Sequence, residues 1–347
     1  MAATRGPAAA SAAPLAPPPV IRLPPEHPPV LSVLVDVEEE FDWVTGFRRE
    51  NRSVTHMADI ERGHEVFDPF GIKPIFVVDH PVADDPAAAA RLGRLAAEGR
   101  CEIGAHLHPW VTPPYDEQVG DHSSFPGNLP PELEAAKLAS LADALEEHVG
   151  VRPRVYQAGR YGLGPHTAGI LEQQGFEVDL SAAPPFDYAG EHGPDYSDWA
   201  PEPYWFGDRR RLLGLPMTGA WVGFAGGASA PLHRVARHPL GLALHLPGIL
   251  SRLGAVDRLR LSPEGFSVGD MRRLTDALLR RGVRSFALSF HSPSLVPGHT
   301  EYVRTADDLT RFLDTCREYF RYFFRELGGV TMSALELKSH LEERFAS

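Results

Sequence analysis

Two histidines, His106 and His108, stand two residues apart at the end of a short apolar run that Pro109 closes. Successive side chains of a strand point to opposite faces, so residues i and i+2 share one face. Two imidazoles on one face can chelate a metal ion, and we interpret the pair as half of a metal site. Since the chain has 16 histidines, the alternative is a chance pair in which His106 is a core residue.

A second polar pair, Asp36 and Glu38, follows another apolar run. Metal-assisted hydrolysis requires three protein ligands, an open coordination position and a separate general base. Glu38 with His106 and His108 makes a ligand set that is common in catalytic zinc sites, and Asp36 is left as the base. The alternative is a solvated acidic turn, because the charge continues through residues 38–40.

Further candidates also follow predicted strands. His291 comes directly after the run SFALSF, and an imidazole with a pKa near neutrality suits a general acid. Arg160, in a glycine-rich segment, either holds a catalytic carboxylate in place or lies on the surface. Loop aromatics such as Trp43, Trp110 and Tyr161 suit stacking on a sugar ring, although they can equally pack in the core.

Apolar runs that alternate with helical patterns predict seven or eight strand–helix repeats, and hence parallel strands joined by crossover helices. The candidates follow strands, and sites in such folds lie at the carboxyl ends of strands. A doubly wound sheet fits the alternation, but the spread of the candidates favours a barrel. The predicted strands are Val30–Val37, Lys73–Asp79, Cys101–His106, Arg154–Ala158, Glu177–Leu180, Arg211–Pro216, Asp257–Leu261, Ser285–Phe290 and Val330–Met332.

The predicted helices cover residues 58–67, 85–99, 131–149, 165–174, 231–253, 268–281 and 305–327, with a last one after Ser333. The clearest is 305–327, whose apolar residues follow a 3.6-residue period and whose Thr305 and Asp308 resemble a capping box. Two long loops, Trp110–Pro130 and Ser181–Trp205, are rich in proline and aspartate. Loops of that length usually have a function in a compact domain.

Composition limits the classes of function. The formal net charge of −12 argues against nucleic acid as a partner, and two cysteines imply no disulfide framework. Residues 1–28 form an Ala/Pro-rich tract that we expect to be a disordered tail, and residues 29–347 a single catalytic domain. The tract lacks the apolar core of a signal peptide, and no apolar stretch is long enough to span a bilayer. We therefore expect a cytoplasmic protein without a transmembrane segment.

Four segments together resemble the NodB-homology polysaccharide deacetylase family, carbohydrate esterase family 4, of which the chain looks like a divergent member. The segments are Asp36-Val37-Glu38, Glu102-Ile-Gly-Ala-His106, Gln157-Ala-Gly-Arg160-Tyr-Gly and Phe290-His291-Ser-Pro. This resemblance implies a distorted (β/α) barrel of about seven parallel strands. It also implies a divalent metal ion, with Zn²⁺ expected, and a carbohydrate substrate.

The implied reaction is the metal-dependent hydrolysis of an N-acetyl, or less often O-acetyl, group on a polysaccharide or glycan. Asp36 would be the base, and His291 would protonate the leaving amine. Three positions depart from the family pattern: Trp110 stands where the second metal histidine usually lies, Glu38 replaces aspartate, and Gln157 replaces arginine, with Arg160 as its possible substitute. The alternatives are a small-molecule amidohydrolase on the same barrel and a non-catalytic carbohydrate-binding relative.

Overall fold

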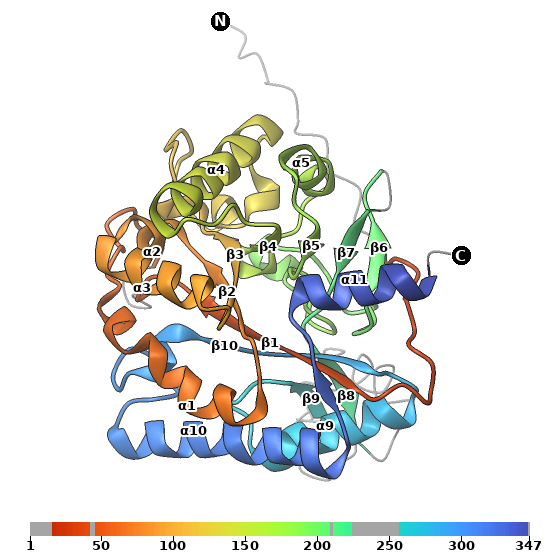
Figure 1. Ribbon diagram of the computed structural model, residues 1–347. Coiled ribbons are helices and arrows are strands. Elements are labelled where there is room, and N and C mark those ends of the chain that lie inside the picture. The colour runs from red at the N-terminus through yellow and green to blue at the C-terminus, as the bar shows by residue number, and fades with distance from the viewer. Residues whose placement is uncertain (1–15, 42–45, 209–210, 224–256, 346–347) are drawn as a thin grey trace, which may run out of the picture.

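A curled, mostly parallel sheet organises the molecule (Figure 1). The structure, a computed structural model, describes residues 16–41, 46–208, 211–223 and 257–345. Strand order is β10-β1-β2-β3-β4-β5-β7-β6, with β11 paired to β1; β6 is antiparallel to β7, and the other neighbours run parallel. The strands are β1 Val30–Val37, β2 Ile75–Val78, β3 Glu102–Leu107, β4 Val155–Ala158, β5 Val178–Asp179, β6 Tyr204–Phe206, β7 Leu212–Gly214, β10 Ser285–His291 and β11 Val330–Thr331. The predicted distorted (β/α) barrel of about seven parallel strands is confirmed.

Strand β1 lies between β10 on one side and β2 and β11 on the other, and it is buried along its whole length. Its valines and leucines suit a strand that is covered on both faces, where side chains alternate between two apolar layers. The register pairs Asp36 with His291 on β10, and His106 on β3 with Gln157 on β4. Parallel pairing thus places the polar ends of four strands at one edge of the sheet.

Helices cover the sheet on both sides (Figure 1). On α10, Phe312 packs edge-on against Phe290 of β10, with ring centroids 5.3 Å apart. The predicted capping box of Thr305 and Asp308 is present at its start. The α-helices are α1 His64–Phe67, α2 His80–Asp84, α3 Pro86–Ala97, α4 Pro131–Ala144, α5 Thr167–Gln174, α9 Val268–Arg280, α10 Ala306–Arg321 and α11 Ala334–Phe345. Among the described residues, no helix has the length and apolar character that a membrane span requires.

Short helical turns fill most of the remaining connections. Within the loop predicted at 110–130, three such turns follow one another. The 3₁₀ turns are Thr55–Gly63, Asp68–Phe70, Pro109–Val111, His122–Ser124, Pro126–Asn128, Gly159–Tyr161, Ala189–Glu191 and Ser292–Leu295, and π-helical turns at Leu145–Val149 and Tyr322–Glu326 extend α4 and α10.

One predicted strand does not join the barrel. β9, Asp257–Arg260, pairs antiparallel with β8, Gly219–Val222, in a separate two-stranded sheet. Of its four residues only Leu259 is buried, and such a half-polar strand cannot lie inside a sheet that is covered on both faces. The predicted helix at 231–253 and Trp43 lie outside the described residues.

The expectation of a disordered tail over residues 1–28 is wrong for its last third. Val20 forms a β-bridge with Tyr204, and the N–H of Ile21 donates to the carbonyl of Pro203 at 2.6 Å. Leu23 is only 5% exposed and belongs to a buried apolar cluster that includes Leu341 of α11. The apolar residues that interrupt the Ala/Pro pattern therefore bury enough surface to hold this segment on the domain. Residues 1–15 lie outside the described part of the chain.

Candidate metal centre

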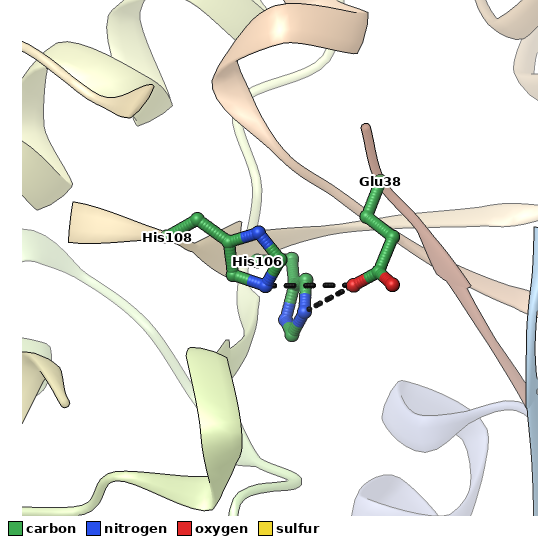
Figure 2. A group of neighbouring side chains, drawn as sticks. All are labelled: Glu38, His106 and His108. Carbon is green, nitrogen blue, oxygen red and sulfur yellow. Dashed lines mark hydrogen bonds and ion pairs between the residues drawn. The ribbon is translucent and has the colours of Figure 1, made fainter. Parts of the chain in front are cut away.

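Glu38, His106 and His108 meet at the carboxyl edge of the sheet (Figure 2). The Nε2 atoms of His106 and His108 lie 3.2 and 3.4 Å from the same carboxylate oxygen, Oε2 of Glu38. Both histidines are buried, and they point to one face because they are two residues apart on extended backbone at the end of β3. A glycine at 159 is required beside them, since a Cβ there would lie 2.6 Å from Cδ2 of His108.

The partners of the two Nδ1 atoms determine that Nε2 of each ring carries a lone pair and no proton. Nδ1 of His106 lies 3.3 Å from the carbonyl of Gln157, and Nδ1 of His108 lies 2.8 Å from Oε2 of Glu39. A carbonyl or carboxylate oxygen only accepts, so we assign the proton of each ring to Nδ1. Burial lowers the pKa of His106 to about 3 and that of His108 to about 4, so both rings are neutral at pH 7.

Two imidazole lone pairs therefore face one carboxyl oxygen, and neither ring supplies a proton between them. Burial also raises the pKa of Glu38, which shows that its charge is poorly solvated where it lies. A cation among the three atoms would relieve both effects, and two nitrogens with one carboxylate are a common ligand set for zinc. These residues fit a divalent metal ion.

Asp36 lies beside this group, and only one of its two carboxylate oxygens has a hydrogen-bond partner among the described residues. Oδ2 accepts a hydrogen bond of 3.0 Å from Nε2 of Gln157, whereas Oδ1 is buried and has no hydrogen-bond partner in the described structure. Gln157 therefore occupies the place beside the aspartate that the resemblance gives to arginine. The free oxygen suits a group that must accept a proton.

The side chain of Arg160 is directed to other partners than Asp36, so the prediction that it holds the catalytic carboxylate is wrong. Its guanidinium donates to Oγ of Ser124 at 2.6 Å and to Oε2 of Glu191 at 2.5 Å, and it stacks on the ring of Phe125. β4 ends before it, and its backbone is left-handed with φ of 54°. The alternation of the strand therefore no longer directs this side chain to the site.

His291 is held by Glu264, a residue that the sequence did not suggest. Nδ1 of His291 lies 2.7 Å from Oε2 of Glu264, and the His291 N–H donates to Oε1 at 3.1 Å. Burial disfavours the imidazolium, but the charges of Glu264 and Glu38 outweigh it and raise the pKa of His291 well above its ordinary value. Nε2 thus carries a proton, and this nitrogen lies 3.7 Å from Oδ2 of Asp36.

Glu39 is a second residue that sequence reasoning missed. It is completely buried, which excludes a solvated turn at this position. Its carboxylate accepts from Nδ1 of His108 and from Nε1 of Trp110, both at 2.8 Å. Its N–H donates to Asp79, whose pKa is raised by burial and by the neighbouring side-chain carboxyl of Glu39. Glu39, Asp79 and His108 could together hold an ion, but Glu39 already orients His108 without one.

The site opens into a cavity of about 320 Å³ that all the described candidates line. Trp110 is 3% exposed, and its ring packs between His108 at 4.3 Å and Phe47 at 4.8 Å. It therefore supports the ring of His108 and offers little surface for a sugar to stack on. Tyr161 reaches the cavity, and Tyr302 at its rim is 44% exposed.

The fold, but not the sequence, matches known proteins. No protein-family model and no curated protein sequence matches the chain. A solved structure described as a candidate polysaccharide deacetylase from Mycobacterium smegmatis superposes with a TM-score of 0.56 at 16% identity, over 96% of both chains. A second, from Pseudomonas aeruginosa, gives 0.52 at 15% identity over 91% of both.

The chain has the polysaccharide deacetylase fold. The predicted resemblance is thereby confirmed at the level of the fold, and the polysaccharide deacetylase fold here carries Glu38, His106 and His108 at the carboxyl edge of its sheet. The spacing of two between the histidines is compatible with this fold, because His108 directly follows β3 with an extended backbone and so points to the same face as His106.

Proposed function

We propose that the chain is a metal-dependent deacetylase that hydrolyses an N-acetyl, or less often O-acetyl, group on a polysaccharide or glycan. The observation that carries this proposal is the arrangement of complementary groups around one cavity. Three acceptor atoms converge in it, beside a carboxylate with a free oxygen and a histidine that keeps its proton. Deacetylation needs these three functions together.

Glu38, His106 and His108 would hold the divalent ion, with zinc the expected one. When bound there, the ion would polarise the acyl carbonyl and make a neighbouring water more acidic. Glu39 supports the set by holding Nδ1 of His108. Such partners behind a ligand fix its ring orientation and raise its basicity.

The proton transfers follow from the protein's own atoms. Oδ1 of Asp36 accepts a proton from the attacking water, while Gln157 keeps the other oxygen in place. Nε2 of His291 donates its proton to the nitrogen or oxygen that leaves the acyl carbon. Glu264 stabilises the protonated ring before the transfer and orients it afterwards through the bond to Nδ1.

Features of the cavity support a carbohydrate substrate. Tyr302 offers an exposed ring at its rim, and Tyr161 lines its wall. Aromatic faces suit the apolar face of a sugar ring. The proteins with matching folds are described as polysaccharide deacetylases, in line with this substrate class.

One observation favours a second candidate, a small-molecule amidohydrolase. The cavity volume of about 320 Å³ lies near the lower end of the range for ligand pockets, roughly 300–1,000 Å³. A compact acetylated molecule would fill it, whereas a polymer would extend beyond its rim.

Acetate release distinguishes the candidates. The zinc-loaded protein is incubated with N-acetylated oligosaccharides, and we expect acetate that a chelator abolishes. Asp36→Asn should retain the metal and slow the reaction by about 10²–10⁴-fold, the usual value of a positioned base. Asp59→Asn, on an exposed turn, is the matched control and should react normally. If a broad panel of acetylated sugars gives no acetate while metal is bound, the small-amide candidate replaces the glycan deacetylase.

A further inference from the structure

Arg260, the last residue of β9, lines the same cavity as the candidate metal site. Its Nη1 donates to the hydroxyl of Tyr161 at 2.9 Å, and its Nη2 donates to the hydroxyl of Tyr188 at 3.0 Å. The guanidinium also lies over two aromatic rings, 4.3 Å from the centroid of Phe186 and 4.9 Å from that of Tyr161. The side chain is thus fixed in one position by neutral partners.

The charge of Arg260 has no counter-ion in the described part of the chain. The other arginine of the cavity, Arg160, pairs with Glu191 at 2.5 Å. Arg260 has only the two phenols, whose pKa values are raised by burial, so they stay neutral and do not offset its charge. A partly buried arginine cannot release its proton, and a cation kept from water without a counter-ion is costly.

The donors that remain on this group suit an anion. A guanidinium has five N–H donors, and the tyrosines use two of them. Each hydroxyl that accepts from Arg260 still has its own proton to donate. Planar arrays of N–H groups bind carboxylates in a bidentate manner, and such charge-assisted hydrogen bonds are about twice as strong as neutral ones.

The backbone holds Tyr161 in place for this role. Arg160 and Tyr161 are consecutive non-glycine residues with left-handed φ of 54° and 60°. This conformation is uncommon for side chains of their size. The carbonyl of Tyr161 accepts a 2.6 Å hydrogen bond from the hydroxyl of Tyr196, which is completely buried. The Tyr161 ring stacks on that of Tyr188 with centroids 5.6 Å apart, so both hydroxyls are positioned before any ligand binds.

We propose that Arg260, Tyr161 and Tyr188 bind a carboxylate of the substrate, so that the acetylated sugar carries an acidic group or adjoins a uronic acid. This inference rests on the proposed glycan deacetylase function and narrows its substrate class. Asp36 and Glu38 line the same cavity and disfavour anions near the reacting acyl group. Arg260 is therefore the group of this set that attracts a carboxylate, and it selects ligands whose carboxylate lies on the β9 side of the cavity.

A matched pair of ligands tests the proposal. One is an N-acetylated disaccharide that contains a uronic acid, and the other is its carboxyl-reduced form, in which a CH₂OH group replaces the carboxylate. Calorimetry on the zinc-loaded full chain with Asp36→Asn measures binding without turnover. We expect the acidic sugar to bind about 10- to 100-fold more tightly, in keeping with a hydrogen bond between charged groups.

Arg260→Gln should abolish this preference, and Tyr188→Phe, which keeps the ring and removes the hydroxyl, should reduce it several-fold. Arg258→Gln is the matched control, because Arg258 lies on the same strand and stacks on the same Phe186 ring but does not line the cavity. Melting temperatures check that each variant is folded. If Arg260→Gln does not fold, Tyr188→Phe decides the question.

Equal affinity for the two sugars, a preference that persists in both variants, or no binding of the acidic sugar would overturn the proposal. Acetate release in the wild-type background separates it from the proposed function. An Arg260-dependent preference without acetate from either sugar supports the anion site and contradicts deacetylation. Acetate from both sugars at equal rates, unchanged by Arg260→Gln, supports deacetylation and contradicts the anion site.

Discussion

Strand β3 has a buried polar group at each end, and the two ends differ in what faces that group. At its start, Glu102 accepts hydrogen bonds from Oγ of Ser333 at 2.7 Å and from the N–H of Ala334 at 3.0 Å, at the first turn of α11. At its end, Nε2 of His106 faces an oxygen of Glu38, and we assign no proton to this nitrogen. An acceptor that meets donors is structural, whereas acceptors that meet one another fit a bound cation.

The same criterion applies to a third buried group. Nε2 of His56 lies 2.7 Å from Oγ of Ser292, and its Nδ1 lies 3.3 Å from Oε1 of Glu40, in the order of a hydrolase triad. Ser292 is completely buried and does not line the cavity, so no substrate can reach it. Because its donors and acceptors match, this group belongs with Glu102, and it connects the segment after β1 to the 3₁₀ turns of His56 and Ser292.

The largest expected effect comes from the carboxyl end of β3. We predict that His106→Ala or His108→Ala reduces bound zinc from about one ion per chain to nearly none, since three protein ligands are the rule for a catalytic site. Metal analysis of the purified protein measures this. His166→Ala, on an exposed histidine, is the control. Unchanged metal content in both variants would mean that these imidazoles are not ligands.

A smaller loss of metal binding is expected when Glu39, the hydrogen-bond partner of His108, is changed. Glu39→Gln weakens the acceptor of the His108 N–H, and we predict a metal affinity lower by about 10- to 100-fold, the usual cost of losing such a partner. Competition with a chromogenic chelator measures the affinity. Trp110→Phe keeps the ring on His108 and removes only the other donor to Glu39, so its effect should be weaker. An equal loss in both variants would point to general damage to the site.

The protonation of His291 provides a test by pH. Glu264 and Glu38 raise the pKa of His291, so a reaction that needs the protonated ring is active below that raised pKa and is lost as the pH rises through it. Glu264→Gln removes the largest stabilising charge, so the alkaline loss of acetate release should move to lower pH. A pH–rate profile with an unchanged alkaline limb would show that His291 is not the acid.

The smallest effect is expected at the other end of β3, and on stability alone. Glu102→Ala leaves the donors at the start of α11 without their acceptor, and we predict a loss of about 1–3 kcal/mol in the free energy of unfolding. Urea denaturation measures it, with the exposed neighbour Glu98→Ala as the control. Metal content should stay unchanged. If zinc binding fell with Glu102→Ala, the two ends of the strand would not be separable as proposed.

Much of the site could be read from the sequence because strand ends are local features. Apolar runs locate β1, β3 and β10, and the parallel alternation of strands and helices places their carboxyl ends at one edge. The polar residues that follow these runs, from Asp36 and Glu38 to His291, were therefore expected to lie close together. The period of two along a strand also explains why His106 and His108 share a face.

The tertiary structure decided which partners these residues have. Glu39 and Glu264 come from segments 69 and 27 residues away from the histidines that they hold, and Arg260 meets Tyr161 across 99 residues. Such pairs depend on strand register and on the course of loops, which leave no periodic pattern in the chain. The tertiary structure likewise decided that Gln157, and not Arg160, lies beside Asp36. This placement follows from where β4 ends and from the left-handed backbone at residue 160.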